Sequence, residues 1–223
     1  SYWSLNNDTY DYGGSNDGTN YGATRTADGK VGAAYDFGGD DYIDLDSNPE
    51  EGLTEFTISG WVNADSFSNN PYIYGTSATS YLNGRFYLFI RASPAGTIDF
   101  DYTDGVSHID TTNDGDTLSP DTWHHVAVVN DGSYIRRYLD GQSTGTADSH
   151  SVGAVVTNRP SYLGALNYED DGGPQTGRSL DGAIDELMII NRSLTPTEIK
   201  QLYYAGIAGG HTLDSSLTAV GED

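Results

Sequence analysis

Two adjacent carboxylates, Asp185 and Glu186, stand near the start of a mostly apolar run that ends at Ile190. A carboxylate among buried strand residues is costly unless it is paired or binds a metal ion. Successive strand residues point to opposite faces, so we expect these two side chains on opposite sides of a sheet. Glycoside hydrolysis with retention needs two carboxyl groups about 5–5.5 Å apart, but Met188 and Ile190 occupy the downstream positions for a second acid. Asp185 is therefore a better candidate for a metal ligand than for a catalytic acid.

The other reactive side chains form no recognisable catalytic motif. His124 and His125 are adjacent on an apolar strand, so their rings are expected on opposite faces and do not readily share one metal ion. Asp99 and Asp101 alternate with apolar residues, and we expect both to face water. Cysteine is absent, which excludes disulfides and thiolate chemistry. With no Ser-His-Asp order, phosphate loop or HExxH motif in the sequence, we predict no catalytic residues.

Tyrosine is the dominant aromatic residue, with 17 copies in the chain. A tyrosine ring stacks on a sugar ring while its hydroxyl bonds the sugar's hydroxyls. Five tyrosines are expected in loops or on outward strand faces: Tyr72, Tyr74, Tyr81, Tyr87 and Tyr168. The predicted ligand-binding residues are Tyr74, Tyr87, Tyr168, Asp170 and Asp171, where the last three share one acidic loop. The alternative is that each tyrosine is an ordinary half-buried strand residue.

Short strands joined by turns must position these side chains. The chain has 223 residues and 28 glycines, and alternating apolar residues recur over 42–45, 56–62 and 97–102. Turn signals separate the runs, including Asn130-Asp131-Gly132. Roughly a dozen short strands predict an all-β, two-sheet antiparallel β-sandwich. Residues 184–190 are predicted to form one of its central strands.

One short C-terminal helix is expected after that strand. Thr195 is an N-cap, Pro196 takes the first helical position, and Glu198 completes a capping box. Ile199 and Leu202 give the helix an apolar face. After Ala205 the chain is rich in glycine and polar residues, so we predict a domain over residues 1–205 and a tail or linker over 206–223.

The formal net charge is −23, from 33 acidic and 10 basic residues. Such a surface repels nucleic acid and anionic membranes, so neither is an expected partner. No apolar stretch in the sequence reaches membrane-spanning length, and we expect no membrane insertion. Two interpretations of the acidity stay open, namely calcium binding and adaptation to high salt, where screening removes the self-repulsion.

Six segments in order resemble the laminin-G-like, concanavalin A-like lectin/glucanase group of jelly-roll domains. They are residues 2–5 with 16–19, 29–43, 56–62, 123–127, 138–141, and 180–186 with 191–195. The resemblance implies a jelly roll and, in similar domains, one structural Ca²⁺ near the joined chain ends. Mapped onto this sequence, its ligands are Asp185, with Gly39 or Asp40, and a group near Asp8 or Asp11. Alternatively, Asp185 caps backbone amides or pairs with Arg192.

The function expected from these features is a non-catalytic, extracellular or cell-surface recognition or adhesion module. Its partners are a glycan or glycosylated cell surface and other domains of the same parent protein, and the start at Ser1-Tyr2-Trp3 suggests a domain excised from a longer chain. The dispersed acidity with few lysines favours a halophilic microbial source. The alternatives are a domain of a polysaccharide-degrading enzyme and a structural spacer, because one fold hosts many functions.

Overall fold

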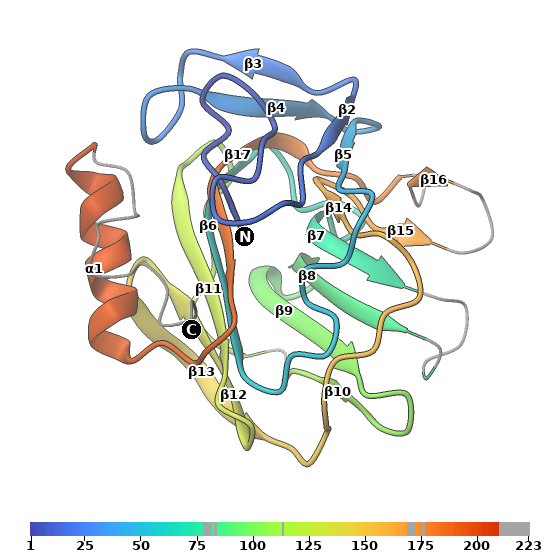
Figure 1. The fold of residues 1–223 in the computed structure, drawn as a ribbon. Helices are drawn as coiled ribbons and strands as arrows, with labels where there is room; N and C mark the ends of the chain where they lie inside the picture. The colour runs from blue at the N-terminus through green and yellow to red at the C-terminus, as the bar shows by residue number, and fades with distance from the viewer. Residues whose placement is uncertain (78–81, 83, 113, 169–172, 175–176, 210–223) are drawn as a thin grey trace.

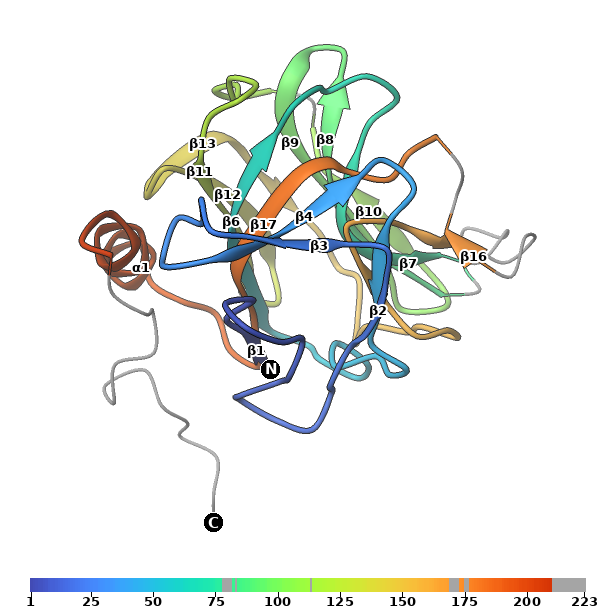
Figure 2. The ribbon, with the colours of Figure 1, turned by 90° about the horizontal axis from the view of Figure 1, so that it is seen from above.

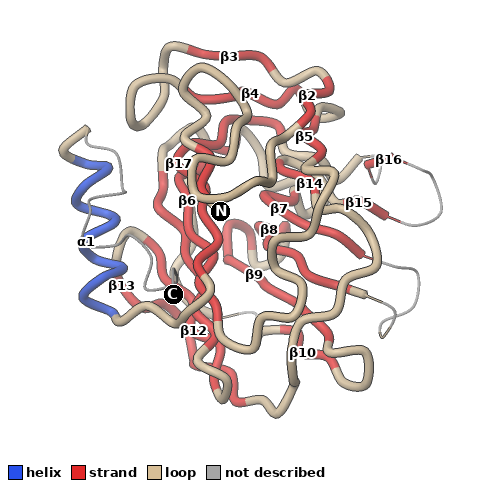
Figure 3. The backbone as a smooth tube through the Cα atoms, in the orientation of Figure 1, coloured by secondary structure: helices blue, strands red, loops and turns tan. Residues whose placement is uncertain are grey.

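The computed structural model describes residues 1–77, 82, 84–112, 114–168, 173–174 and 177–209. Two β-sheets packed face to face make up most of this part of the chain (Figures 1 and 3). Sheet A consists of β1 (Tyr2–Trp3), β3 (Thr24–Thr26), β4 (Ala34–Gly38), β6 (Phe56–Ala64), β11 (His124–Asn130), β12 (Tyr134–Leu139), β13 (Gln142–Ser149) and β17 (Asp181–Ile190). Sheet B consists of β2 (Thr19–Tyr21), β5 (Tyr42–Asp44), β7 (Tyr72–Ser77), β8 (Arg85–Ala92), β9 (Ala95–Thr103), β10 (His108–Asp110), β14 (Tyr162–Leu163), β15 (Asn167–Tyr168) and β16 (Gly173–Pro174).

The strand orders are those of a sandwich with crossovers between its sheets. Sheet A runs β13-β12-β11-β6-β17-β4-β3, with β1 added to β17. Sheet B runs β10-β9-β8-β7-β14-β5-β2, and β15 pairs with β7 in parallel. The predicted central strand is β17, which lies between β6 and β4. The predicted two-sheet sandwich is therefore confirmed.

The main core lies between the two sheets. Strand alternation sends one face of each sheet inward, and large side chains such as Trp3, Phe56, Phe86 and Phe100 fill the space with no exposed surface. Phe56, Phe86 and Phe100 meet edge-on or tilted, with ring centroids 5.0–5.7 Å apart. This packing fixes which face of each sheet remains for other contacts.

The helix α1 (Pro196–Ile207) covers the outer face of sheet A, on the side away from sheet B (Figures 1 and 2). Its predicted capping box is present, with Thr195 as N-cap and Glu198 returning the bond. Ile199 and Leu202 pack on the sheet with Met188 and Ala127. The helix continues to Ile207, so its last residues lie within the segment predicted as the tail.

Among the described residues, no helix packs on the outer face of sheet B. Its inner side chains belong to the main core, while a second set of aromatic and charged side chains stands on the opposite side. We refer to this opposite side as the free face of sheet B. It carries the candidate site.

Candidate functional site

An aromatic cluster stands on the free face of sheet B. It consists of Tyr72, Phe89 and Leu166, with Tyr87 and Tyr168 packed against them. The Tyr72 ring lies 5.3 Å from those of both Tyr87 and Phe89. Tyr87 and Phe89 are two residues apart on β8, so they share a face, and Tyr72 is paired with Phe89 in register. Tyr72 and Tyr87 therefore lie on the outer side of sheet B, but Tyr72 and Phe89 are only 4% and 7% exposed, and Tyr87 is half-buried.

Ion pairs border this cluster. Arg85 pairs with Asp101, and Arg91 pairs with Asp99. The hydroxyl of Tyr87 donates to Asp101 Oδ2 over 2.9 Å. Each pair joins β8 to β9, because alternate residues of both strands point to the free face. The cluster thus has charged hydrogen-bonding groups along one side.

The expectation that Asp99 and Asp101 face water is wrong. Their strand face was predicted correctly, but they have exposed fractions of only 0% and 1%. Long arginine and tyrosine side chains from β8 lie over them. Burial raises the pKa of each carboxyl to about 6, against the opposing effects of hydrogen bonds and of the arginine charges. An arginine partner favours the charged carboxylate, which is then a strong acceptor for hydroxyl groups.

Tyr74 does not belong to this site. It lies in the main core with no exposed surface, and its hydroxyl donates to Glu50 Oε2 over 2.7 Å. A bulge between Tyr72 and Tyr74 shifts the register, so the two rings are not on one face. Its predicted outward position is therefore wrong. The predicted residues Tyr81, Asp170 and Asp171 lie outside the described residues.

The expectation that Asp185 and Glu186 point to opposite sides is also wrong. The β6–β17 register shifts between Asp185 and Met188, and Glu186 has a left-handed backbone with φ of 52°. Asp185 is opposite Trp61, which stacks on α1. Glu186 Oε2 accepts the hydroxyl of Tyr2 over 2.6 Å, on that same outer side of sheet A. A bulge therefore places both acids beneath the helix side of the sheet.

Asp185 is buried and only partly bonded. Its Oδ2 accepts the backbone N–H of Val31 over 2.7 Å, as in the capping alternative, while its Oδ1 accepts no hydrogen bond of normal geometry. Burial raises its pKa to about 7. Arg192 instead pairs with Glu198 at 2.8 Å, so the alternative Asp185–Arg192 pair does not form.

The other predicted metal ligands lie in two separate places. Asp11 organises the N-terminal loop, where its oxygens accept the N–H groups of Tyr2 and Asn16 over 2.7 and 3.1 Å. Asp8 accepts the hydroxyl of Tyr12 over 3.0 Å. Both acids therefore have protein partners.

Gly39 and Asp40 lie at the other end of β17. The N–H of Gly39 donates to the carbonyl of Leu180 over 3.0 Å. Leu180 precedes Asp185 by five residues, a separation of roughly 16 Å along a strand. One ion cannot contact Asp185 and Gly39 together, because calcium–oxygen distances are about 2.3–2.6 Å. Among the described residues, no group of three or more acidic or histidine side chains could hold a metal ion.

The two histidines are engaged in packing. His125 is buried beneath α1, with its Nε2 2.9 Å from Ser59 Oγ, and burial lowers its pKa to about 4. His124 Nδ1 lies 2.8 Å from Asp140 Oδ2. The Ser59–His125 contact has no access to solvent, since Ser59 is fully buried.

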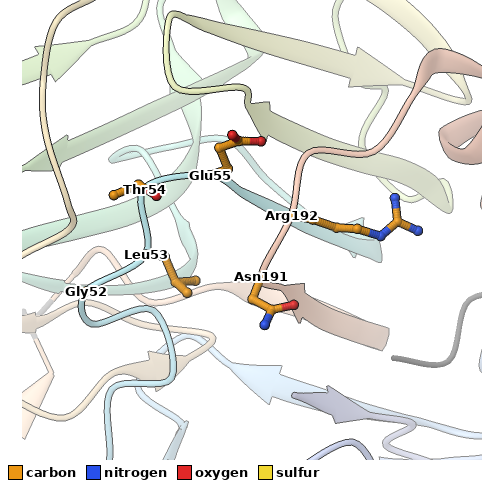
Figure 4. Close-up of a pocket in the computed structure, with 6 residues that line it drawn as sticks. All are labelled: Gly52, Leu53, Thr54, Glu55, Asn191 and Arg192. Atoms are coloured by element: carbon orange, nitrogen blue, oxygen red, sulfur yellow. The ribbon is translucent and has the colours of Figure 1, made fainter. Parts of the chain in front are cut away.

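A hollow of about 370 Å³ lies where the chain enters β6 and leaves β17 (Figure 4). It is lined by Gly52, Leu53, Thr54, Glu55, Asn191 and Arg192. Glu55 already accepts the hydroxyl of Ser193 over 3.0 Å, and Arg192 pairs with Glu198. Its charged groups are thus used by the protein itself.

The family model of the concanavalin A-like lectin/glucanases superfamily, Laminin_G_3, matches residues 37–200. The chain therefore belongs to this family. No curated protein sequence matches it. No described helix is long and apolar enough to cross a bilayer.

Solved structures share the fold at low sequence identity. Domain 4 of AbnA, a GH43 extracellular arabinanase from Geobacillus stearothermophilus in complex with arabinotriose, is 22% identical with a TM-score of 0.62, over 90% of this chain and 95% of that one. The binding domain of Paraclostridial Mosquitocidal Protein 1 is 16% identical with a TM-score of 0.61, over 84% of this chain and 47% of that one. Trypanosoma rangeli sialidase is 14% identical with a TM-score of 0.58, over 94% of this chain and 33% of that one.

Sequence reasoning missed the arginines and Phe89 of the site. The signal was present in β8, where Arg85, Tyr87, Phe89 and Arg91 alternate with inward apolar residues. Such an alternation shows that four large side chains share the outer face. It does not show that Asp99 and Asp101 on the next strand pair with two of them.

Proposed function

We propose that this chain is a non-catalytic, extracellular glycan-binding module, and that its ligand binds on the free face of sheet B. The observation that carries this proposal is the half-buried Tyr87 and Tyr168, which pack on the buried Tyr72 and Phe89 beside the Arg85–Asp101 and Arg91–Asp99 pairs. Aromatic rings stack on the apolar faces of sugars. Guanidinium groups form strong, directional hydrogen bonds to hydroxyls, and the Arg91 side chain is 21% exposed above the buried Asp99. The family and the bound arabinotriose of the AbnA domain support this choice of ligand.

Binding to a panel of soluble polysaccharides tests the proposal. Arabinan, xylan, mannan and β-glucan are titrated against the wild type, Tyr87→Ala and Tyr168→Ala by calorimetry. Loss of one stacking contact is expected to weaken binding about tenfold, equal to about 1.4 kcal/mol. The control is Tyr134→Ala, because Tyr134 is 42% exposed on β12 of the other sheet. No binding to any glycan would contradict the proposal, and release of reducing sugar would support a catalytic domain instead.

We also propose that Asp185 anchors a structural Ca²⁺, with Glu186 and main-chain carbonyls as further ligands. Two observations support this: the Oδ1 of Asp185 accepts no hydrogen bond of normal geometry, and the bulge brings both acids to one side. Calcium accepts carbonyl and carboxylate oxygens together and would neutralise the buried charge.

A chelator tests the calcium proposal, because an ion that binds only the folded state raises stability. The chelator should lower the melting temperature of the wild type and of Asp181→Asn, an exposed control on β17. Asp185→Asn should show no such shift. An unchanged wild-type midpoint contradicts this proposal.

A further inference from the structure

Three stacked tyrosines form a ladder at the other end of sheet B. Tyr21 of β2 stacks on Tyr42 of β5, with ring centroids 4.8 Å apart and planes 9° apart. Tyr42 stacks in turn on Tyr162 of β14, at 4.5 Å and 26°. We call these three residues the tyrosine ladder. The rings come from strands that are neighbours in the sheet but remote in sequence.

The tyrosine ladder stands on the same free face as the aromatic cluster. Ile43 and Leu163 belong to the main core, so their neighbours Tyr42 and Tyr162 point to the opposite side. In the strand register, Tyr162 of β14 is opposite Gly75 of β7. Gly75 is in turn opposite Tyr87 of β8, which belongs to the cluster.

Gly75 allows the two aromatic sets to come close together. A Cβ at Gly75 would collide with that of Tyr87 and press on Leu166 Cδ1 at 3.1 Å. The absence of a side chain at Gly75 of β7 therefore permits the cluster and the tyrosine ladder to approach each other closely. The cluster and the ladder form one row across the strands.

The hydroxyl groups of the ladder are available for a ligand. Within the described part of the chain, none of its three hydroxyls makes a hydrogen bond, although Tyr162 is only 6% exposed. The hydroxyls of Tyr74 and Tyr2, by comparison, donate to Glu50 and Glu186. The ladder thus presents donors that the fold itself does not use.

The charges around the row favour an uncharged ligand. Arg85 and Arg91 are each paired with buried aspartates, and Arg178 donates to the Tyr72 hydroxyl over 3.3 Å, so all three arginines are engaged by the protein itself. Burial and, to a lesser degree, the nearby Asp44 carboxylate raise the pKa of Tyr162 to about 12, opposed more weakly by Arg159. The net charge of −23 adds long-range repulsion of anions. Uronates and sialylated chains are therefore disfavoured relative to neutral sugars.

We propose that the tyrosine ladder is a second sugar subsite, and that the ligand is an extended neutral oligosaccharide lying across the strands. The oligosaccharide would reach from Tyr87 on β8 to Tyr21 on β2. These two strands are four strand spacings apart, which is roughly 19 Å. Tyr21 offers an open ring at the sheet edge, with 48% of its surface exposed. This inference rests on the proposed glycan-binding function of the free face.

Chain-length dependence tests the second subsite. Linear arabino-oligosaccharides, with xylo- and cello-oligosaccharides in parallel, are titrated as trisaccharides and hexasaccharides by calorimetry. The hexasaccharide should bind the wild type about tenfold more tightly than the trisaccharide. Tyr21→Ala and Tyr42→Ala should remove that gain and leave trisaccharide binding unchanged. Tyr204→Ala is the matched control, because Tyr204 is 55% exposed on α1.

Each result has a distinct consequence. Equal affinity for both lengths, or a gain that survives Tyr21→Ala and Tyr42→Ala, overturns the subsite and leaves the glycan-binding face standing. Tighter binding of oligogalacturonate than of the neutral hexasaccharides overturns the preference for a neutral ligand. Failure of every oligosaccharide and of the polysaccharide panel overturns both the proposed function and this inference. Unchanged melting temperatures of the variants establish that the losses arise at the surface.

Discussion

Removing the arginine of the Arg85–Asp101 pair tests the electrostatics of the candidate site. The change is Arg85→Met, which keeps an aliphatic side chain of similar reach. The side chains of Arg85 and Asp101 are only 10% and 2% exposed, so water compensates little for the lost charge. Breaking a buried pair on one side leaves an uncompensated charge. The variant is therefore expected to be less stable, in a manner that depends on pH.

The magnitude follows from the titration of Asp101. Burial raises its pKa to about 6, against the opposing charge of Arg85. An unfolded aspartate has a pKa near 3.9, so the folded state binds this proton more tightly and stability falls as the pH rises from about 4 to about 6. Without Arg85 the pKa of Asp101 rises further. The free energy of unfolding then keeps falling above pH 6, by about 1.4 kcal/mol per pH unit. The extra loss is then about 1.4 kcal/mol at pH 7 and absent near pH 5.

Urea denaturation of wild type and variant between pH 5 and 8 measures this difference. A constant loss at every pH is expected in addition, because the Arg85 guanidinium stacks 5.2 Å above the Tyr87 ring. The control is Arg136→Met, whose pair with Asp131 is 35% and 31% exposed and should contribute less than about 1 kcal/mol. A penalty for Arg85→Met that is the same at pH 5 and pH 8 would refute the reasoning, since Asp101 would then not be a buried, uncompensated acid.

The remaining predictions concern α1, His125 and the net charge. Gly206→Val should lower the melting temperature by several degrees relative to Ala208→Val, because a Cβ at Gly206 collides with the Trp61 ring; equal midpoints would mean that α1 is not tightly docked. Burial lowers the pKa of His125 to about 4, so the unfolded chain binds a proton at this histidine before the folded protein does, and stability falls between pH 6.5 and 4. His125→Gln should reduce that fall in urea titrations. Identical pH profiles of variant and wild type would contradict this. Lowering the salt concentration at saturating Ca²⁺ should lower the melting temperature, because the net charge of −23 is then less screened; a midpoint independent of salt would argue against salt adaptation.

Local sequence patterns were sufficient for the architecture. The alternation of Phe56, Ile58 and Gly60 with Thr57, Ser59 and Trp61 assigned the two faces of β6 correctly. Side-chain direction along a strand depends only on the period of two. The capping box of Thr195 and Glu198 fixed the start of α1 for a similar reason, since all its hydrogen bonds lie within four residues.

The tertiary structure decided what covers each face and which strands meet. The sequence put Asp99 and Asp101 on the correct side of β9, but their burial depends on Arg85 and Arg91 of the paired strand. A bulge, which no alternation reveals, turned Glu186 to the side of Asp185. Tyr21, Tyr42 and Tyr162 became neighbours only because β2, β5 and β14 are adjacent in sheet B. Residue periodicity is a local property, whereas register and cross-strand contact depend on segments far apart in the chain.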